Sequence, residues 1–142
     1  MALAQYIAGM GFSNVGLGIV HSMAHPLSAV YDIPHGVACA ILLTPVLKFN
    51  APSTADKYRD IAVAMGVKNT EDMSIEQARQ ACIEAVEKLS VDVGIPRKLT
   101  QLGVKEEDLQ FLSESAFVDA CTPGNPRDVS VEAIKEIYKS IM

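Results

Sequence analysis

The chain contains no tryptophan, and only 6% of its residues are aromatic, so a platform for stacking nucleobases or sugars is not indicated. Cysteine is also scarce. The three cysteines, Cys39, Cys82 and Cys121, have no C-x-x-C spacing, and an odd number of them argues against a disulfide framework. Cys39 and Cys82 fall on the apolar faces of expected helices, which predicts core positions for both.

Positive charge is limited as well. Lys and Arg number 12 against 17 Asp and Glu, and no basic stripe occurs, so we expect no nucleic-acid partner. No apolar run reaches the roughly 18 residues that span a bilayer. The first residues also lack the basic segment of a secretory signal. These absences predict a cytoplasmic protein with no membrane partner.

What the chain does have is helical periodicity. With 142 residues, 49% of them hydrophobic, it is expected to form one globular domain, residues 1–142. Alternation of side-chain type with a period of two, which is typical of β-strands, is nowhere sustained. We therefore predict an all-α domain of about six or seven helices. The expected helices are 2–10, 15–31, 34–49, one opened by Ser53, 74–93, 105–121 and one capped by Ser130.

Glycine and proline set the expected helix boundaries. The first helix is expected to stop in the turn Gly9-Met-Gly11. Pro26 removes the amide that would bond the Ser22 carbonyl, which predicts a kink or an end within 15–31. The pattern Ser74-Ile-Glu-Gln77 is typical of a capping box. The glycines of 9–11 and 16–18 are expected to let helices approach closely, because no preceding strand supports a dinucleotide loop.

The three histidines, His21, His25 and His35, all lie within fifteen residues. His21 and His25 are four apart on one helix, and His35 follows a turn that folds the chain back. Two helices meeting at this corner can bring His21 and His35 to one point, where neutral imidazoles are good ligands for divalent iron or zinc. The alternative is that these histidines are packed or exposed residues that bind no metal.

The H-x-x-x-H spacing also occurs on the metal-binding helix of zinc metalloproteases. In those enzymes the residue after the first histidine is the glutamate base. Here that residue is Ser22, so a general base is missing and the protease interpretation is excluded.

Longer motifs carry a resemblance to a known family. The segments AGMGFSNVGLG (8–18), HSMAHP (21–26), IPHGV (33–37), AILLTP (40–45) and DACTPGNPR (119–127) resemble the iron-containing (group III) alcohol dehydrogenases, and in particular their lactaldehyde reductase and 1,3-propanediol dehydrogenase branch. The resemblance covers essentially the whole chain. It implies the C-terminal helical domain of a two-domain enzyme, related to the dehydroquinate synthase-like fold.

The resemblance implies a role for each candidate site residue. His21 and His35 match two metal ligands for Fe²⁺ or Zn²⁺, and His25 matches a catalytic histidine near the nicotinamide that is thought to relay protons. Phe12 and Cys121 match positions that line the substrate pocket. The expected substrate is a small alcohol or aldehyde, and NAD(P) is expected to be bound mainly by another domain.

The resemblance also implies a missing half. The family's upstream Asp-x-x-x-His ligand pair and its N-terminal nucleotide-binding domain are absent from these residues, so we expect a fragment that is inactive alone. The expected partners are that N-terminal domain and further copies of the chain in a homo-oligomer. A non-catalytic helical interaction domain and a weak stand-alone metal-binding module remain the alternatives.

Overall fold

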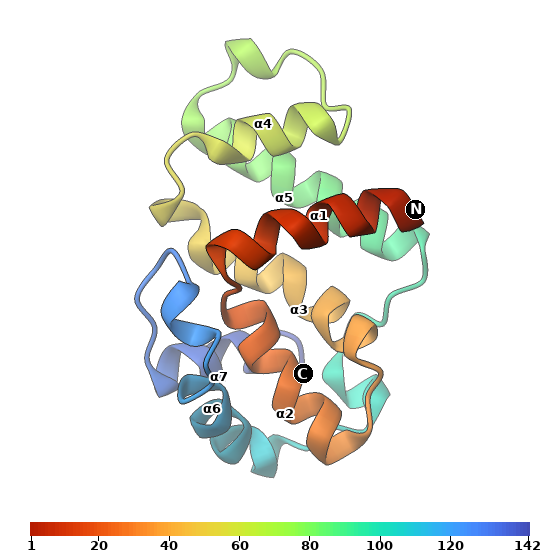
Figure 1. Ribbon diagram of the computed structural model, residues 1–142, viewed down its shortest axis with the longest axis vertical. Coiled ribbons are helices and arrows are strands. Elements are labelled where there is room, and N and C mark those ends of the chain that lie inside the picture. Colours follow the sequence, from red (N-terminus) through yellow and green to blue (C-terminus); the bar gives the residue numbers. More distant parts are fainter.

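The computed structural model describes all 142 residues, which form seven α-helices and no β-strand (Figure 1). This confirms the predicted all-α fold. The helices are α1 (Ala2–Val15), α2 (Ile19–Tyr31), α3 (His35–Asn50), α4 (Lys57–Ala64), α5 (Ile75–Asp92), α6 (Leu109–Phe117) and α7 (Val131–Lys139), and the connections after α3 contain short 3₁₀ turns.

The main core lies where α2 meets α3, α6 and α7. It contains 17 buried apolar residues, to which α2 contributes Ile19, Met23, Ala24 and Leu27. The α6–α7 pair packs against α2 on one side, while α5 packs against α3 on another (Figure 1). Because α2 is enclosed on these sides, its position is fixed by apolar burial before any ligand is considered.

A smaller core lies between α4 and α5. Tyr58 and Ala62 of α4 pack against Cys82 and Ile83 of α5. The helix α5 begins at the predicted capping box, because the Ser74 hydroxyl accepts from the Gln77 amide while the Gln77 side chain accepts from the Ser74 amide. Cys82 is fully buried, as predicted.

The glycine and proline predictions near the N-terminus were partly wrong. Helix α1 continues through Gly9 and Gly11 to Val15, and the chain turns at Gly16, whose φ of 82° is in the left-handed region. Glycine within a helix costs only about 1 kcal/mol and does not force an end. Helix α2 also continues through Pro26 to Tyr31, so the predicted kink or end is not an end. Burial of Met23, Ala24 and Leu27 on both sides of the proline offsets its cost of about 3 kcal/mol.

The predicted helix 105–121 is also shorter than expected. It begins with a 3₁₀ turn at Glu106–Asp108, continues as α6 and ends at Phe117, before the separate 3₁₀ turn at Thr122–Gly124. The final helix α7 begins as predicted, with the Ser130 hydroxyl accepting a hydrogen bond from the Ala133 amide.

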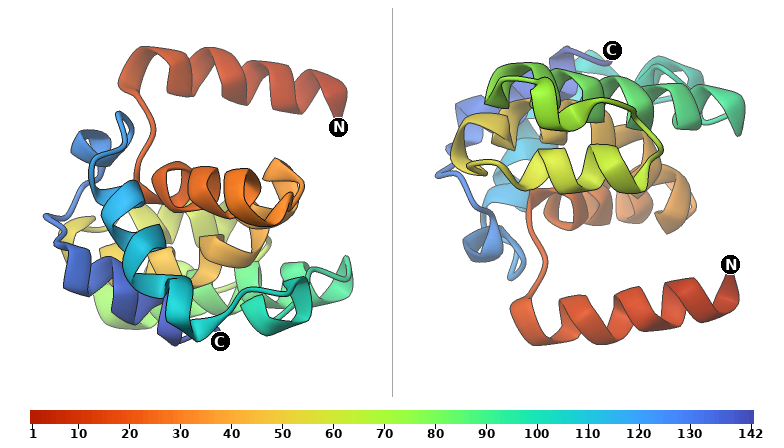
Figure 2. Two further views of the ribbon diagram at one scale, coloured as in Figure 1. Left: turned by 90° about the horizontal axis from the view of Figure 1, so that it is seen from below. Right: turned by 90° about the horizontal axis from the view of Figure 1, so that it is seen from above.

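Helix α1 stands apart from the rest of the molecule (Figure 2). Its axis makes an angle of 108° with α2, and none of its residues is buried. Exposed apolar side chains therefore cover it, namely Leu3, Tyr6, Ile7, Met10, Phe12 and Val15.

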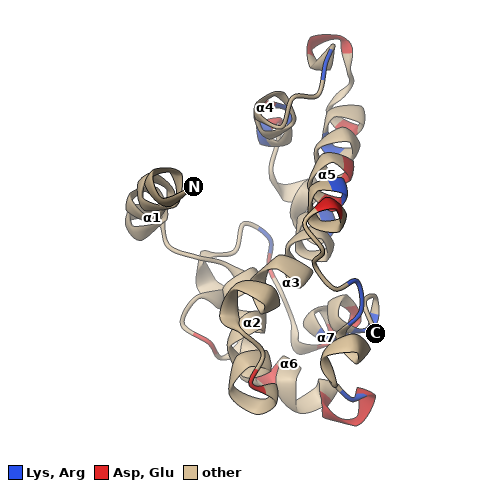
Figure 3. Ribbon diagram, turned by 90° about the vertical axis from the view of Figure 1, so that its right-hand side faces the viewer, with Lys and Arg blue, Asp and Glu red and all other residues tan.

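Charged residues are absent from this end of the protein. The first 31 residues include no Lys, Arg, Asp or Glu, and α3 carries only Lys48 (Figure 3). By length and composition His35–Ser53 would suffice to cross a membrane, and so would the bent pair α1–α2 taken together, but the core helices of globular proteins pass the same test. Here α3 packs between α2 and α5.

The buried hydroxyl of Tyr138 provides a test of how α7 is held against α2. It donates a 2.6 Å hydrogen bond to the Met23 carbonyl, and the side chain is fully buried. Tyr138→Phe should lower the free energy of unfolding by about 1 kcal/mol, since a buried carbonyl loses a donor. Urea denaturation measures this change. Tyr6→Phe is the matched control, because Tyr6 is exposed on α1, and an equal effect of both variants would contradict the assignment.

Candidate metal centre

A tight turn between α2 and α3 brings the histidines together. Asp32 adopts a left-handed conformation with φ 53°, Ile33 is buried and anchors the turn, and Pro34 precedes His35, the first residue of α3. Short polar residues such as aspartate tolerate this conformation better than most. The chain therefore reverses within three residues, and the start of α3 faces the side chains of α2.

The three imidazole rings meet at this corner. The centroids of His21 and His35 are 5.6 Å apart, those of His25 and His35 are 5.5 Å apart, and those of His21 and His25 are 6.4 Å apart. Two imidazoles on one tetrahedral ion have centroids about 5 Å apart, given metal–nitrogen distances near 2.1 Å. The separation of the His21 and His35 rings is therefore close to that of two imidazoles that share an ion.

The surroundings of His21 keep its ring neutral. Partial burial lowers the pKa of His21, and the neighbouring His35 and His25 rings lower it further, while Asp119 opposes them. A neutral imidazole is the form that binds metals. The surroundings of His21 therefore favour the protonation state that a metal ligand needs.

His25 is held by a residue far away in the sequence. Its Nδ1–H donates a 2.7 Å hydrogen bond to Asp119 Oδ2, 94 residues along the chain. In a neutral imidazole this leaves Nε2 as the nitrogen that can accept a proton. The His25 side chain is 44% exposed, so the ring also reaches solvent.

Asp119 is fixed in turn by the segment that follows it. Burial by itself would raise the pKa of the Asp119 carboxyl, but hydrogen bonds from the Cys121 amide and from His25 lower it overall. The carboxylate therefore stays ionised at neutral pH. Burial, followed by the Asp119 carboxylate, raises the pKa of the Cys121 thiol, so this cysteine is not activated as a nucleophile.

The turn carrying Asp119 and Cys121 is attached to α2 and α3 by buried polar contacts. Thr122 Oγ1 donates a 2.8 Å hydrogen bond to Ser22 Oγ, and Asn125 exchanges two amide hydrogen bonds with Asn50 of α3. Gly124 packs so closely against the Leu17 carbonyl that no Cβ atom would fit between them. These contacts fix the position of Asp119 beside His25.

Phe12 lies beside His21, and Cys121 lies beside His25. Both line one depression of about 400 Å³, with Gly16, Leu17 and Gly124 among its other walls. The Phe12 ring centroid is 6.5 Å from that of His21. The sequence thus identified two residues that share a depression next to the imidazoles. Their role in substrate binding stays a prediction.

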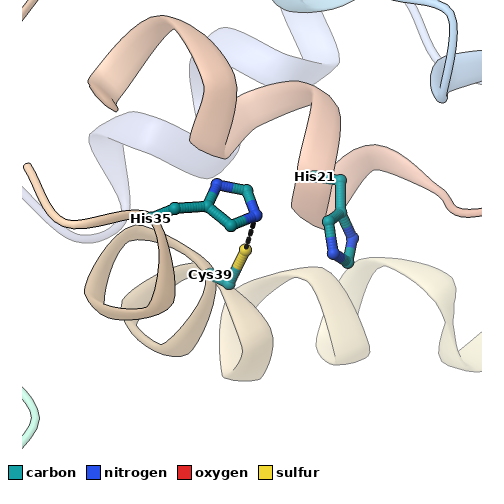
Figure 4. A group of neighbouring side chains, drawn as sticks. All are labelled: His21, His35 and Cys39. Carbon is teal, nitrogen blue, oxygen red and sulfur yellow. Dashed lines mark hydrogen bonds between the residues drawn. The ribbon is translucent and has the colours of Figure 1, made fainter. Parts of the chain in front are cut away.

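Cys39 is not the core residue that the sequence predicted. It is only partly buried, and its Sγ lies 3.4 Å from Nε2 of His35, one helical turn earlier (Figure 4). The helix α3 is apolar on most of its surface, so periodicity did not distinguish its core face from the face next to the histidines.

The structure brings together all five residues that the sequence identified as site candidates and adds two that the sequence reasoning missed. Cys39 was detectable in principle from its position four residues after His35 on the same helix. Asp119 carried no such signal, because its partner His25 is distant in sequence and only the tertiary fold joins them.

Comparisons with known proteins show what the chain as a whole is similar to. Residues 1–142 match the model of the Fe-containing alcohol dehydrogenase family, C-terminal part. The chain is 59% identical to lactaldehyde reductase of Escherichia coli (strain K12) and 45% identical to 1,3-propanediol dehydrogenase of Citrobacter freundii. These alignments cover 97% and 98% of the chain but only 36% of each relative.

A solved structure has the same fold. The chain superimposes on an alcohol dehydrogenase from Oenococcus oeni with a TM-score of 0.90 and 39% sequence identity, over 95% of this chain and 35% of that one. The chain therefore spans about a third of the length of the proteins that it resembles.

The contact of Gly124 with Leu17 provides a test of how the site is assembled. A Cβ atom at Gly124 would lie 2.0 Å from the Leu17 carbonyl oxygen, so Gly124→Ala must displace the turn next to Asp119. We expect a loss of about 1–3 kcal/mol in the free energy of unfolding, typical of overpacking. Thermal or urea unfolding measures it. Gly11→Ala is the control, because a Cβ there meets no atom within 4 Å, and a neutral Gly124→Ala would contradict the close contact.

Proposed function

The chain belongs to the Fe-containing alcohol dehydrogenase family, and on this basis we propose that it is the helical, metal-holding part of an enzyme that interconverts a small primary alcohol and an aldehyde with NAD(P). The observation that carries the proposal is the convergence of His21, His25 and His35 at the α2–α3 corner. The match of the whole chain to the family supports it.

In this proposal His21 and His35 hold the cation, Fe²⁺ or Zn²⁺. When bound, the cation supplies Lewis-acid polarisation of an alcohol hydroxyl. Two imidazoles are half of a four-coordinate set, so the remaining donors come from elsewhere in the parent enzyme or from water. Burial of His21 keeps it neutral and ready to bind, which supports its assignment as a ligand.

His25 is proposed as the residue that moves the hydroxyl proton. Its Nδ1–H is engaged by Asp119, so Nε2 is the atom that accepts the proton from the site. The exposed part of the ring then passes the proton to solvent. In the aldehyde-reducing direction the same atom donates the proton.

Asp119 is proposed as a positioning residue. Its carboxylate fixes the orientation and tautomer of the His25 ring and stabilises the ring when it is protonated. Phe12 and Cys121 are proposed to shape the pocket for the alcohol, with no chemical step of their own.

The proposed partner is an N-terminal nucleotide-binding domain, which would hold most of the NAD(P). An uncharged helix with no buried residue is a suitable docking surface, and α1 meets both conditions. Phe12, near the end of α1, lies beside His21, so a domain docked on α1 would also border the histidines. Of this chain's residues, His25 is the one proposed to lie near the nicotinamide.

A chimera tests the proposed function. The 142-residue chain alone should not oxidise alcohols with NAD, because it offers two protein ligands and no nucleotide-binding domain. Replacing the aligned segment of Escherichia coli lactaldehyde reductase with this chain should give an active enzyme, since the two are 59% identical there. His21→Ala and His35→Ala should each remove bound iron and activity.

The readouts are metal content after purification and NADH formation with a short-chain diol as substrate. Lys139→Gln, far from the histidines on α7, should leave both unchanged. Turnover by the isolated chain would contradict its predicted inactivity. Full iron content in the two histidine variants would contradict the metal assignment.

The role of Asp119 is tested in the same chimera. Asp119→Asn should lower kcat by about 10-fold, the lower end of the roughly 10- to 100-fold effects of partners that orient metal-ligating histidines. The pH dependence of kcat should change as well, because Asp119 acts through a proton-transferring ring. Asp128→Asn is the matched control, since Asp128 is an exposed carboxylate of the same loop. An unchanged pH profile in Asp119→Asn would assign it a structural role only.

A further inference from the structure

A separate pocket lies between α3, α5 and the C-terminal end of the chain. Its volume is about 270 Å³, and none of the three histidines lines it. A cavity of about 150 Å³ holds one benzene molecule, so this pocket has room for a ligand of about six to ten non-hydrogen atoms. Apolar side chains form much of its wall, namely those of Ile41, Pro45, Val91, Ile95, Pro96 and Ile141.

The floor of the pocket belongs to the main core. Ile41 is almost fully buried, and Ile95 and Ile141 pack against the same core. Two backbone hydrogen bonds fix the segments on either side. The Leu99 amide donates a 2.7 Å hydrogen bond to the Ile141 carbonyl, and the Ile95 amide donates a 2.9 Å hydrogen bond to the Ser90 carbonyl. The pocket is therefore formed by the packing of the chain itself, as small-molecule sites usually are.

The polar side of the pocket carries two cations and one carboxylate. Lys48 Nζ lies 3.3 Å from Glu87 Oε2, and a guanidinium nitrogen of Arg97 lies 3.5 Å from Glu87 Oε1. Both contacts are longer than the roughly 2.7–2.9 Å of a charge-assisted hydrogen bond, so neither cation is fully engaged. One positive charge is thus left uncompensated at this pocket, in a chain whose net charge is −5.

This combination of charge and apolar wall selects among classes of ligand. A cation would have to compete with Lys48 and Arg97 for Glu87. A phosphate would exceed the single uncompensated charge and would lose its hydration against apolar walls. A monocarboxylate can accept hydrogen bonds from both cations, and a hydrocarbon chain attached to it would bury apolar surface against the core.

We propose that this pocket binds an aliphatic monocarboxylate of about five to eight carbons. The carboxylate lies between Lys48 and Arg97, and the hydrocarbon chain lies on the apolar floor formed by Ile41, Ile95 and Ile141. The pocket shares no residue with the proposed metal centre or with the depression next to Phe12 and Cys121. The inference is therefore independent of the proposed function.

Titration of the purified chain with hexanoate, in the presence of EDTA, tests the site. Isothermal calorimetry should show saturable binding, and changes in amide NMR shifts should be confined to α3, α5 and the end of the chain. Lys48→Met and Arg97→Gln should each weaken binding by about 10-fold, the effect of losing one charge-assisted hydrogen bond. Lys88→Met is the matched control, because Lys88 neighbours Glu87 on α5 but does not line the pocket.

Two further variants separate ligand binding from a structural role of the ion pairs. Glu87→Gln should bind hexanoate about 3-fold more tightly, since it removes a competing carboxylate whose attraction to a partly exposed cation is of this size. A purely structural role of Glu87 predicts weaker binding instead. Val91→Trp should block the pocket, and the half-exposed position of Val91 leaves room for the larger side chain. Far-ultraviolet circular dichroism reports whether each variant is folded.

Neutral and doubly charged probes complete the test. 1-Hexanol should bind at least about 10-fold more weakly than hexanoate, because it cannot form the charge-assisted contacts. Inorganic phosphate should not displace hexanoate. Equal binding of hexanoate and 1-hexanol, displacement by phosphate, weaker binding in Glu87→Gln or the absence of saturable binding would each overturn the proposal.

The outcome is distinguishable from that of the proposed function. His21→Ala should leave hexanoate binding unchanged, whereas the same variant should remove iron and activity from the chimera. Shift changes centred on the histidines, or loss of hexanoate binding in His21→Ala, would place the carboxylate elsewhere and reject the pocket as its site.

Discussion

The packing of α2 against α3 across the turn at Asp32–Pro34 is the constraint on which the rest of the site depends. The apolar side chains of α2 are buried in the main core with those of α3, α6 and α7. Because this burial fixes the two helices relative to each other, the imidazoles on their adjoining edges are fixed as well. The geometry of the histidine corner therefore follows from the packing of the apolar core.

Local patterns in the sequence predicted the parts of the fold that depend on neighbouring residues. The capping box at Ser74, the hydroxyl cap at Ser130 and the shared face of His21 and His25 all follow from spacings of three or four residues. The meeting of His21 with His35 was predictable too, because a turn of three residues leaves two helices little choice of direction. Where the structure differed, as at Gly9, a weak local preference yielded to the hydrogen bonds of the continuing helix.

Features that depend on distant segments were not accessible from the sequence. The hydrogen bond between His25 and Asp119 exists because the turn at Thr122–Gly124 is fastened to α2 through Ser22 and to α3 through Asn50. None of these pairings has a sequence spacing that reveals it. Cys39 illustrates another limit, since hydrophobic periodicity assigns every face of an apolar helix to the core and cannot mark the one that meets the histidines.

The open setting of the histidines agrees with the exposure of α1. Water competes for an ion at a surface site, and burial of such a site strengthens every electrostatic interaction within it. Helix α1 is uncharged and unburied, and its Phe12 ring lies next to His21, so the apolar surface and the histidine corner adjoin. A single domain that docked on α1 would then remove apolar surface from water and exclude solvent from the imidazoles in the same step. The free energy gained by burying the apolar surface of α1 would thereby stabilise a form of the site from which solvent is excluded. Helices α2 and α3 alone leave the histidines open to solvent.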